Sequence, residues 1–138
     1  MDKKTLDILV RNDGKTPSCW SAVTLVEGEA VVVILNSSHS KGRQSSDLMH
    51  ELSHRILDHQ THQVNVSPGG IMLVASYDKQ QEEEADWLSG TLLLPRDALV
   101  SVANMVLGEE ETAVRYGVSI SMLRYRMNVT AVRKRHGQ

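Results

Sequence analysis

The sequence predicts a small α+β fold, and three features of its pattern support this. Two short runs of aliphatic residues lie in the first third of the chain. A stretch with helical periodicity and three histidines follows them, and helix-forming residues broken by glycines fill the last third. Helices and short strands in such an irregular order are typical of α+β folds. With 138 residues, 41% of them hydrophobic, the chain suits one domain over residues 1–138, with a helical C-terminal segment at 108–138.

The composition excludes several classes of protein. The single cysteine, Cys19, rules out an internal disulfide and a cysteine-based zinc cluster. The net charge of −2 rules out a strong attraction of the whole molecule to nucleic acid. The longest aliphatic run is too short to cross a bilayer, and the first fifteen residues lack the apolar stretch of a signal peptide. We therefore expect a cytoplasmic protein that does not contact a membrane.

The first half of the chain predicts a hairpin followed by a helix. We expect a short helix over residues 3–10, then strands over 22–26 and 30–35 joined by a turn at Glu27 and Gly28. The second strand is apolar on both faces, so it should lie inside a sheet. After a loop over 36–44, a helix should begin at Ser45, Ser46 or Asp47, whose side chains can accept an unpaired backbone N–H. This helix should end between residues 59 and 62.

The second half predicts a strand and then helices only. Residues 64–70, "VNVSPGG", indicate a turn, and residues 71–77, "IMLVASY", a short strand. A second helix should span residues 80–94 and stop at Pro95, because proline cannot continue a helix. Helices broken at Gly108 and Gly117 should complete the chain.

The first helix carries a pattern typical of a metal site. His50 and His54 are four residues apart, so both imidazoles lie on one helical face and can bind one divalent ion at about 2.0–2.1 Å. Glu51 lies between them, offset from the ion but well placed to accept a proton from a water on it. The alternative interpretation is a surface helix with exposed histidines.

The second helix supplies the acidic groups that such a site needs. A catalytic zinc has a third protein ligand and an open position for water. We assign Glu82 as that ligand, with Glu83 as the alternative. Asp86, four residues after Glu82, would accept the ring N–H of a ligating histidine. Ser89 and Gly90 are small and would let this helix approach the first one closely. The acidic run could instead be a solvated helix start.

Together these segments resemble the ImmA/IrrE family of metallo-endopeptidases over roughly residues 29–128. The resemblance is carried by Arg43, "HELSH", His59, "EEEAD" and "WLSGTLLLP". It implies a zincin-like minimal metalloprotease domain, in which a small sheet accompanies an HExxH helix and a helix with the glutamate ligand. Family members often cleave or inactivate helix-turn-helix repressors encoded beside them in phages and mobile elements. A transcriptional repressor is therefore the implied substrate.

The expected chemistry is hydrolysis of a peptide bond. Zinc lowers the pKa of its bound water to about 7 and polarises the scissile carbonyl. Glu51 would take the proton of that water and deliver it to the leaving amine. The oxyanion that forms needs a second donor besides zinc. Tyr77, His59 and His62 are candidates for this transition-state stabiliser.

The C-terminal segment indicates a different function. Ala113, Gly117 and Ser119 have the spacing of a helix-turn-helix, with Ser119 as the cap of the second helix. Arg124 and Arg126 on that helix could contact DNA. The acidic run before it, residues 109–111, would repel phosphate, and two packed helices could simply close the domain. The alternative function is thus a non-catalytic regulatory module that binds DNA or a partner repressor through these helices, with DNA the less favoured partner.

Overall fold

The computed structural model describes residues 20–27, 30–59, 63–67, 70–74, 78–104 and 107–131. The strands are β1 (Ala22–Glu27), β2 (Ala30–Leu35), β3 (Gln63–Ser67) and β4 (Gly70–Val74). The helices are α2 (Lys41–Ile56), α3 (Lys79–Leu93), α4 (Arg96–Ala103), α5 (Glu109–Tyr116) and α6 (Ile120–Val129). The expected α+β class is confirmed, whereas the helix expected at 3–10 lies outside the described residues. None of the described helices is long and apolar enough to cross a membrane.

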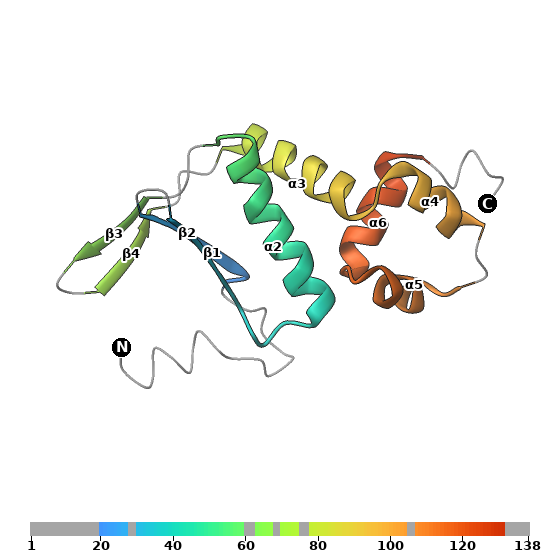
Figure 1. Ribbon diagram of the computed structural model, residues 1–138, viewed down its shortest axis with the longest axis horizontal. Helices are drawn as coiled ribbons and strands as arrows, with labels where there is room; N and C mark the ends of the chain where they lie inside the picture. The colour runs from blue at the N-terminus through green and yellow to red at the C-terminus, as the bar shows by residue number, and fades with distance from the viewer. Residues whose placement is uncertain are drawn as a thin grey trace.

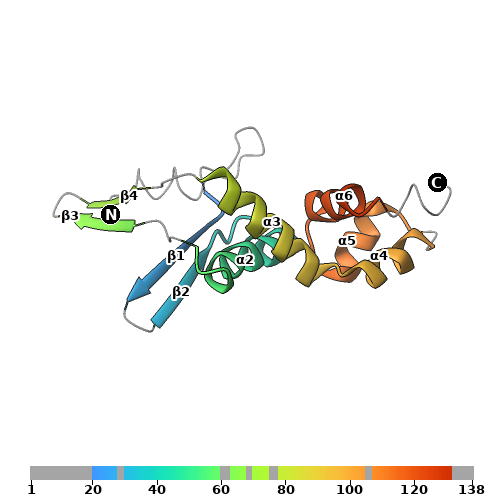
Figure 2. The same ribbon diagram turned by 90° about the horizontal axis from the view of Figure 1, so that it is seen from above.

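The elements follow one another along an elongated molecule. Both views place the two hairpins at one end, α2 and α3 side by side in the middle, and α4, α5 and α6 at the other end (Figures 1 and 2). The site described below therefore depends on how α2 and α3 are fixed to each other and to the groups on either side.

The strands form two separate antiparallel pairs. β1 pairs with β2 from Ala22↔Leu35 to Glu27↔Ala30, which confirms the expected hairpin, although its turn residues 28 and 29 lie outside the described part. β3 pairs with β4, so the turn expected at 64–70 is wrong for residues 64–67 and for Gly70, which belong to the two strands. The sequence "VNVS" alternates apolar and polar residues, which is the period of a strand rather than of a turn.

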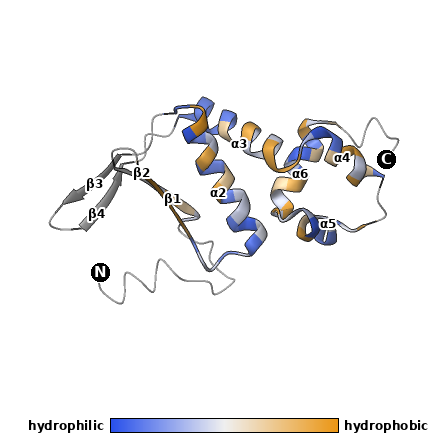
Figure 3. Cartoon of the chain, viewed as in Figure 1, coloured by the Kyte–Doolittle hydropathy of each residue, from blue (hydrophilic) through white to orange (hydrophobic). Residues whose placement is uncertain are grey.

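The strand β2 does not lie inside a sheet. Its sheet has two strands within the described residues, and Val31, Val32 and Ile34 are 36%, 54% and 44% exposed. Figure 3 shows that hydrophobic residues make up much of the β1–β2 hairpin. The expectation is wrong because an apolar run indicates a preference for burial on both faces, but not how many strands are available to cover it.

The helix α2 begins earlier than expected. Its N-cap is Ser40, whose Oγ accepts the backbone N–H of Arg43 at 3.3 Å, so Ser45, Ser46 and Asp47 are not caps. The loop expected at 36–44 is accordingly wrong for residues 41–44. Several serines in this region can cap a helix, and the sequence alone does not choose among them.

The end of α2 is a compact turn. The helix stops at Ile56, whereas an end at 59–62 was expected. Asp58 adopts a left-handed conformation (φ 54°) and its N–H bonds the carbonyl of Arg55 at 3.3 Å. The N–H of His59 then bonds the carbonyl of His54 at 2.9 Å. This pair of bonds is a Schellman motif, which usually has glycine where this chain has Asp58.

The helix α3 matches its expected range within one residue at each end. Asp78 caps it by accepting the N–H groups of Gln80 and Gln81 at 2.9 and 3.4 Å. Pro95 follows the helix and is itself the N-cap of α4. This sharp junction turns the chain from α3 into the C-terminal helices.

The hydrophobic core lies among the C-terminal helices. The expected breaks at Gly108 and Gly117 are confirmed, since Gly108 caps α5 and Gly117 ends it with φ 63°. Ser119 caps α6 as expected, accepting the N–H of Met122 at 3.1 Å. Seven of the buried apolar residues in the described part form one cluster: Leu94, Leu99, Ala103, Ala113, Val118, Leu123 and Met127.

The turn between α5 and α6 holds the beginning of α2. Buried Ser46 donates from Oγ to the carbonyl of Gly42 at 3.0 Å and accepts the N–H of Ser119 at 3.1 Å. A Cβ at Gly42 would collide with the carbonyl of Val118, so glycine is needed for this close approach. Similarly, a Cβ at Gly90 of α3 would collide with the side chain of Arg126, so Gly90 makes room for α6 rather than for α2.

Candidate metal centre

Three side chains from α2 and α3 converge. The Nε2 atoms of His50 and His54 are 3.0 Å apart. Glu82 places Oε2 at 3.2 Å from Nε2 of His50 and Oε1 at 3.5 Å from Nε2 of His54. In a tetrahedral zinc site with bonds of about 2.0–2.1 Å, ligand atoms lie about 3.4 Å apart. The observed spacing is close to that value, and the three residues could hold a metal ion.

The local sequence explains this convergence. The spacing of four residues puts both histidines on one face of α2, and the Asp78 cap starts α3 so that Glu82 lies in its first turn. Ala85 and Ser89 are fully buried, and their small side chains let α3 lie close to its neighbours. The three candidate ligands therefore all come from helices, and they meet where α2 and α3 lie side by side (Figure 1).

A carboxylate supports His50 from behind. Oδ1 of Asp86 lies 2.9 Å from Nδ1 of His50, and since an ionised carboxylate only accepts, Nδ1 carries the proton. In the neutral form of the ring, which is the form that a metal binds, the lone pair of Nε2 is then directed at the converging group. Burial alone would lower the pKa of His50, but the hydrogen bond and charge of Asp86, together with Glu82 and Glu51, outweigh burial and raise it.

His54 has the opposite electrostatic balance. Burial lowers its pKa, and the nearby His50 adds to the effect, while Glu82 and Glu51 oppose it. A metal ligand must be the neutral imidazole, so the environment of His54 favours the form that binds. The surroundings therefore shift the pKa values of the two histidines in opposite directions, although both rings lie on the same face of α2.

The other two glutamates of the acidic run do not reach the histidine pair. Oε1 of Glu83 lies 3.4 Å from Nζ of Lys79, and both side chains are largely exposed. Glu84 accepts a hydrogen bond from Gln80 at 2.9 Å and places Oε2 at 3.0 Å from Nε2 of His59. Of the two candidates, the geometry thus favours Glu82 as the ligand over Glu83.

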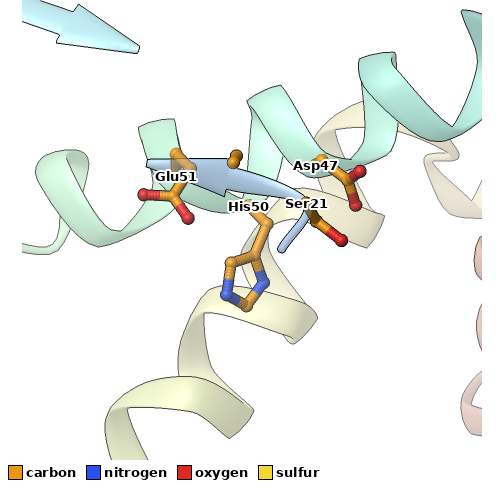
Figure 4. A pocket seen from close by; sticks show the side chains of 5 residues that line it. Ser21, Asp47, His50 and Glu51 are labelled. Atoms are coloured by element: carbon orange, nitrogen blue, oxygen red, sulfur yellow. The ribbon is translucent and has the colours of Figure 1, made fainter. Parts of the chain in front are cut away.

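The carboxylate of Glu51 is held by a strand. The hydroxyl of Thr24 in β1 donates to Oε2 of Glu51 at 2.5 Å. Next to it lies an open pocket of about 290 Å³, lined by Ser21, Ala22, Asp47, His50 and Glu51. Figure 4 shows Glu51 and His50 projecting from α2 beside the start of β1. A molecule in this pocket would lie beside the carboxylate of Glu51 and the imidazole of His50 together.

The rim of the pocket is fixed by charged groups. Nη2 of Arg43 donates to Oγ of Ser21 at 3.0 Å, and Nε of Arg43 lies 3.7 Å from Asp47. Nδ1 of His39 lies 3.3 Å from the same carboxylate. The contacts of Ser21 and Thr24 could not be predicted from the sequence, because they depend on how the start of the chain's first hairpin lies on α2.

Of the three candidate transition-state stabilisers, His59 lies within the described residues. Nδ1 of His59 lies 3.0 Å from Nδ1 of His54, on the side of that ring opposite to Nε2, and the side chain is only 6% exposed. The structure therefore places His59 behind a candidate ligand and away from the pocket. Tyr77 and His62 lie outside the described residues.

The two arginines that could contact DNA in the alternative function are engaged within the protein. Arg126 is 3% exposed, and its Nε donates to the carbonyl of Leu94 at 3.2 Å. Arg124 donates from Nε and Nη2 to Oε2 of Glu109, each at 2.8 Å. These contacts favour the interpretation that α5 and α6 close the domain.

Comparisons with known proteins agree with the geometry. Residues 12–128 match the family Peptidase_M78, described as the IrrE N-terminal-like domain. No curated protein and no solved structure matches the chain. The matched range includes both helices that carry the converging donors, as well as Glu51 and the strand that holds it. The chain therefore belongs to the IrrE N-terminal-like family of metallopeptidases.

Proposed function

We propose that this metallopeptidase is a zinc-dependent endopeptidase that cuts a regulatory protein in the cytoplasm. The observation that carries the proposal is the convergence of two imidazole nitrogens and one carboxylate beside Glu51 at an open pocket. A donor set of two nitrogens and one oxygen suits zinc. His50, His54 and Glu82 would hold the ion.

The chain's own residues would carry out the proton transfers. Zinc, when bound, would act as a Lewis acid and lower the pKa of water at the site. Because Thr24 donates to Oε2 of Glu51, we expect Oε1 to accept the proton of the attacking water and to pass it to the leaving amine. Asp86 keeps the proton of His50 on Nδ1, so that ring stays oriented toward the ligand group through the reaction.

The test is the variant Glu51→Gln. It should lower the rate of peptide hydrolysis by about 10²–10⁴-fold, because a neutral amide cannot accept the proton. Its zinc content should stay at about one ion per chain, since Glu51 is not a ligand. Hydrolysis is measured on a library of unstructured peptides, and zinc by metal analysis of the purified protein. His50→Ala is the matched control that should lose both zinc and activity.

Either of two results would reject the proposal: wild-type protein that binds no zinc, or Glu51→Gln that hydrolyses peptides as fast as the wild type. Incubation with the product of the adjacent gene then tests the substrate. The resemblance supports a helix-turn-helix repressor, for which we expect a single defined cut that Glu51→Gln does not make.

The alternative, a regulatory module without catalysis, has less support. It requires free basic side chains on α6, whereas Arg126 is buried and Arg124 is paired with Glu109. Regulation in cells that survives Glu51→Gln but fails in Arg124→Ala would favour the module. Arg126→Ala does not discriminate, because loss of this buried side chain would damage the fold under either function.

A further inference from the structure

A row of three side chains runs from the surface of α3 to the back of His54. Oε2 of Glu84 lies 3.0 Å from Nε2 of His59, and Nδ1 of His59 lies 3.0 Å from Nδ1 of His54. We propose that Glu84 and His59 form a positioning relay that fixes the tautomer of His54 and thereby increases the affinity of the site for zinc. The inference rests on the proposed function in one respect, that His54 is a zinc ligand.

The direction of each proton in the row follows from the acceptor at its end. An ionised Glu84 can only accept, so Nε2 of His59 carries a proton. A neutral His59 then has a lone pair on Nδ1, which accepts the proton on Nδ1 of His54. His54 is consequently left with its lone pair on Nε2, the atom that lies 3.0 Å from Nε2 of His50 and 3.5 Å from Glu82. One carboxylate thus determines where the proton lies two rings away.

The backbone holds this row in place. The Schellman turn at the end of α2 joins the same two residues, through the bond from the N–H of His59 to the carbonyl of His54. The two rings meet edge to face with centroids 5.1 Å apart. Since His59 is 6% exposed and both of its nitrogens have partners, another orientation of the ring would leave a buried polar atom unsatisfied.

The two histidines on α2 are thus supported in parallel ways. Asp86 accepts directly from His50, whereas Glu84 acts on His54 through an intervening ring. Partners of this kind orient a ligand, and their loss typically lowers metal affinity by about 10–100-fold. The acidic residues on α3 would then have three separate uses: Glu82 as a metal ligand, Asp86 as the partner of His50, and Glu84 as the partner of His59 behind His54.

The experiment measures the dissociation constant for Zn²⁺ by competition with a chelator. His59→Leu keeps a side chain of comparable volume but removes the acceptor, and we expect its affinity to fall by about 10–100-fold. Glu84→Ala should weaken binding by about tenfold. His59→Asn keeps an acceptor near Nδ1 of His54 and should recover part of the loss. Glu83→Ala is the matched control, a neighbouring exposed glutamate whose removal should leave the affinity unchanged.

Two further measurements separate a relay from a general structural effect. In the relay, the losses of His59→Leu and Glu84→Ala should be far from additive in the double variant, because both break the same row. In the metal-free protein, ¹⁵N-resolved NMR of His54 should show the proton on Nδ1, and in His59→Leu it should move toward Nε2. Circular dichroism of each metal-free variant verifies that it is folded, and Glu84→Ala, a surface change, remains informative if His59→Leu does not fold.

The relay is refuted if His59→Leu and Glu84→Ala bind zinc as tightly as the wild type, or if His54 has the same tautomer with and without His59. Either result leaves the proposed function intact when the wild type binds zinc and Glu51→Gln is inactive. Conversely, a wild type that binds no zinc defeats the proposed function, while the NMR measurement still tests the relay on its own.

Discussion

Thr24 in β1 donates a hydrogen bond to Glu51 of α2, the proposed proton acceptor. A hydrogen bond to a charged group contributes about 1.5–3 kcal/mol, and about 1.4 kcal/mol corresponds to a tenfold change in rate. We therefore expect Thr24→Val to lower kcat by about tenfold or more, with KM and zinc content nearly unchanged. Thr24→Ser, which keeps the hydroxyl, should recover most of the rate. Steady-state kinetics on one peptide substrate measures this effect. A valine variant with the wild-type kcat would show that the hydrogen bond from Thr24 does not matter for catalysis.

The choice between adjacent glutamates is a second prediction for single residues. Glu82→Ala should lose zinc, because it removes the only carboxylate of the described residues that lies within 3.5 Å of both ligand rings. Glu83→Ala should keep zinc, since it removes an exposed ion pair with Lys79 that contributes little. Metal analysis of the two variants, purified side by side, decides the matter. The reverse pattern would move the ligand assignment to Glu83.

The candidate site could be predicted from the sequence only as far as helical spacing allows. A separation of four residues brings His50 and His54 together, and the same rule groups Glu82 with Asp86, as the structure has them. Thr24 and Glu84 could not be found in this way. Thr24 is 27 residues away from Glu51 along the chain, and the partner of Glu84 depends on where α2 ends.

Among the elements, α2 gives the sharpest test of close packing. In an open helix, Gly42→Ala should stabilise the protein by about 1 kcal/mol through helix propensity. Here the new methyl would meet the backbone of Val118, so we expect destabilisation of about 1–3 kcal/mol instead. Urea unfolding measures the sign. The control is Gly108→Ala, whose methyl would meet only Glu110 at 3.9 Å and should cost less than about 1 kcal/mol. A stabilised Gly42→Ala would contradict the observed contact.

The ends of elements were harder to predict than their existence. Both hairpin strands, the two ligand-bearing helices and the breaks at Gly108 and Gly117 follow from periodicity and from strong helix breakers. The start of α2 was missed because Ser40 and the later serines have the same capping chemistry. Its end was missed because Asp58 takes the left-handed position that glycine usually occupies, and aspartate in a sequence gives little indication of this.

At the scale of the whole molecule, zinc should add to stability, because it would join α2 to α3 only in the folded state. At a concentration 100-fold above the dissociation constant, a ligand adds about 2.7 kcal/mol, which is roughly 8–10 °C in Tm for a chain of this length. Thermal unfolding with and without zinc measures the shift, and His50→Ala should show none. An equal shift in both proteins would mean that zinc binds elsewhere.

The last two helices have a structural role beyond forming the core. Ser119, in the turn between them, contacts Ser46 of α2, and Arg126 of α6 contacts Gly90 of α3. These contacts help to hold α2 and α3, the two helices that carry the candidate ligands, in place. A shortened chain that stops before Gly108 would keep His50, His54 and Glu82 but would lose the contacts that hold α2 and α3 in place. We therefore expect the smallest active fragment of this protein to extend through α6, well past Glu82, the last of the candidate ligands along the chain.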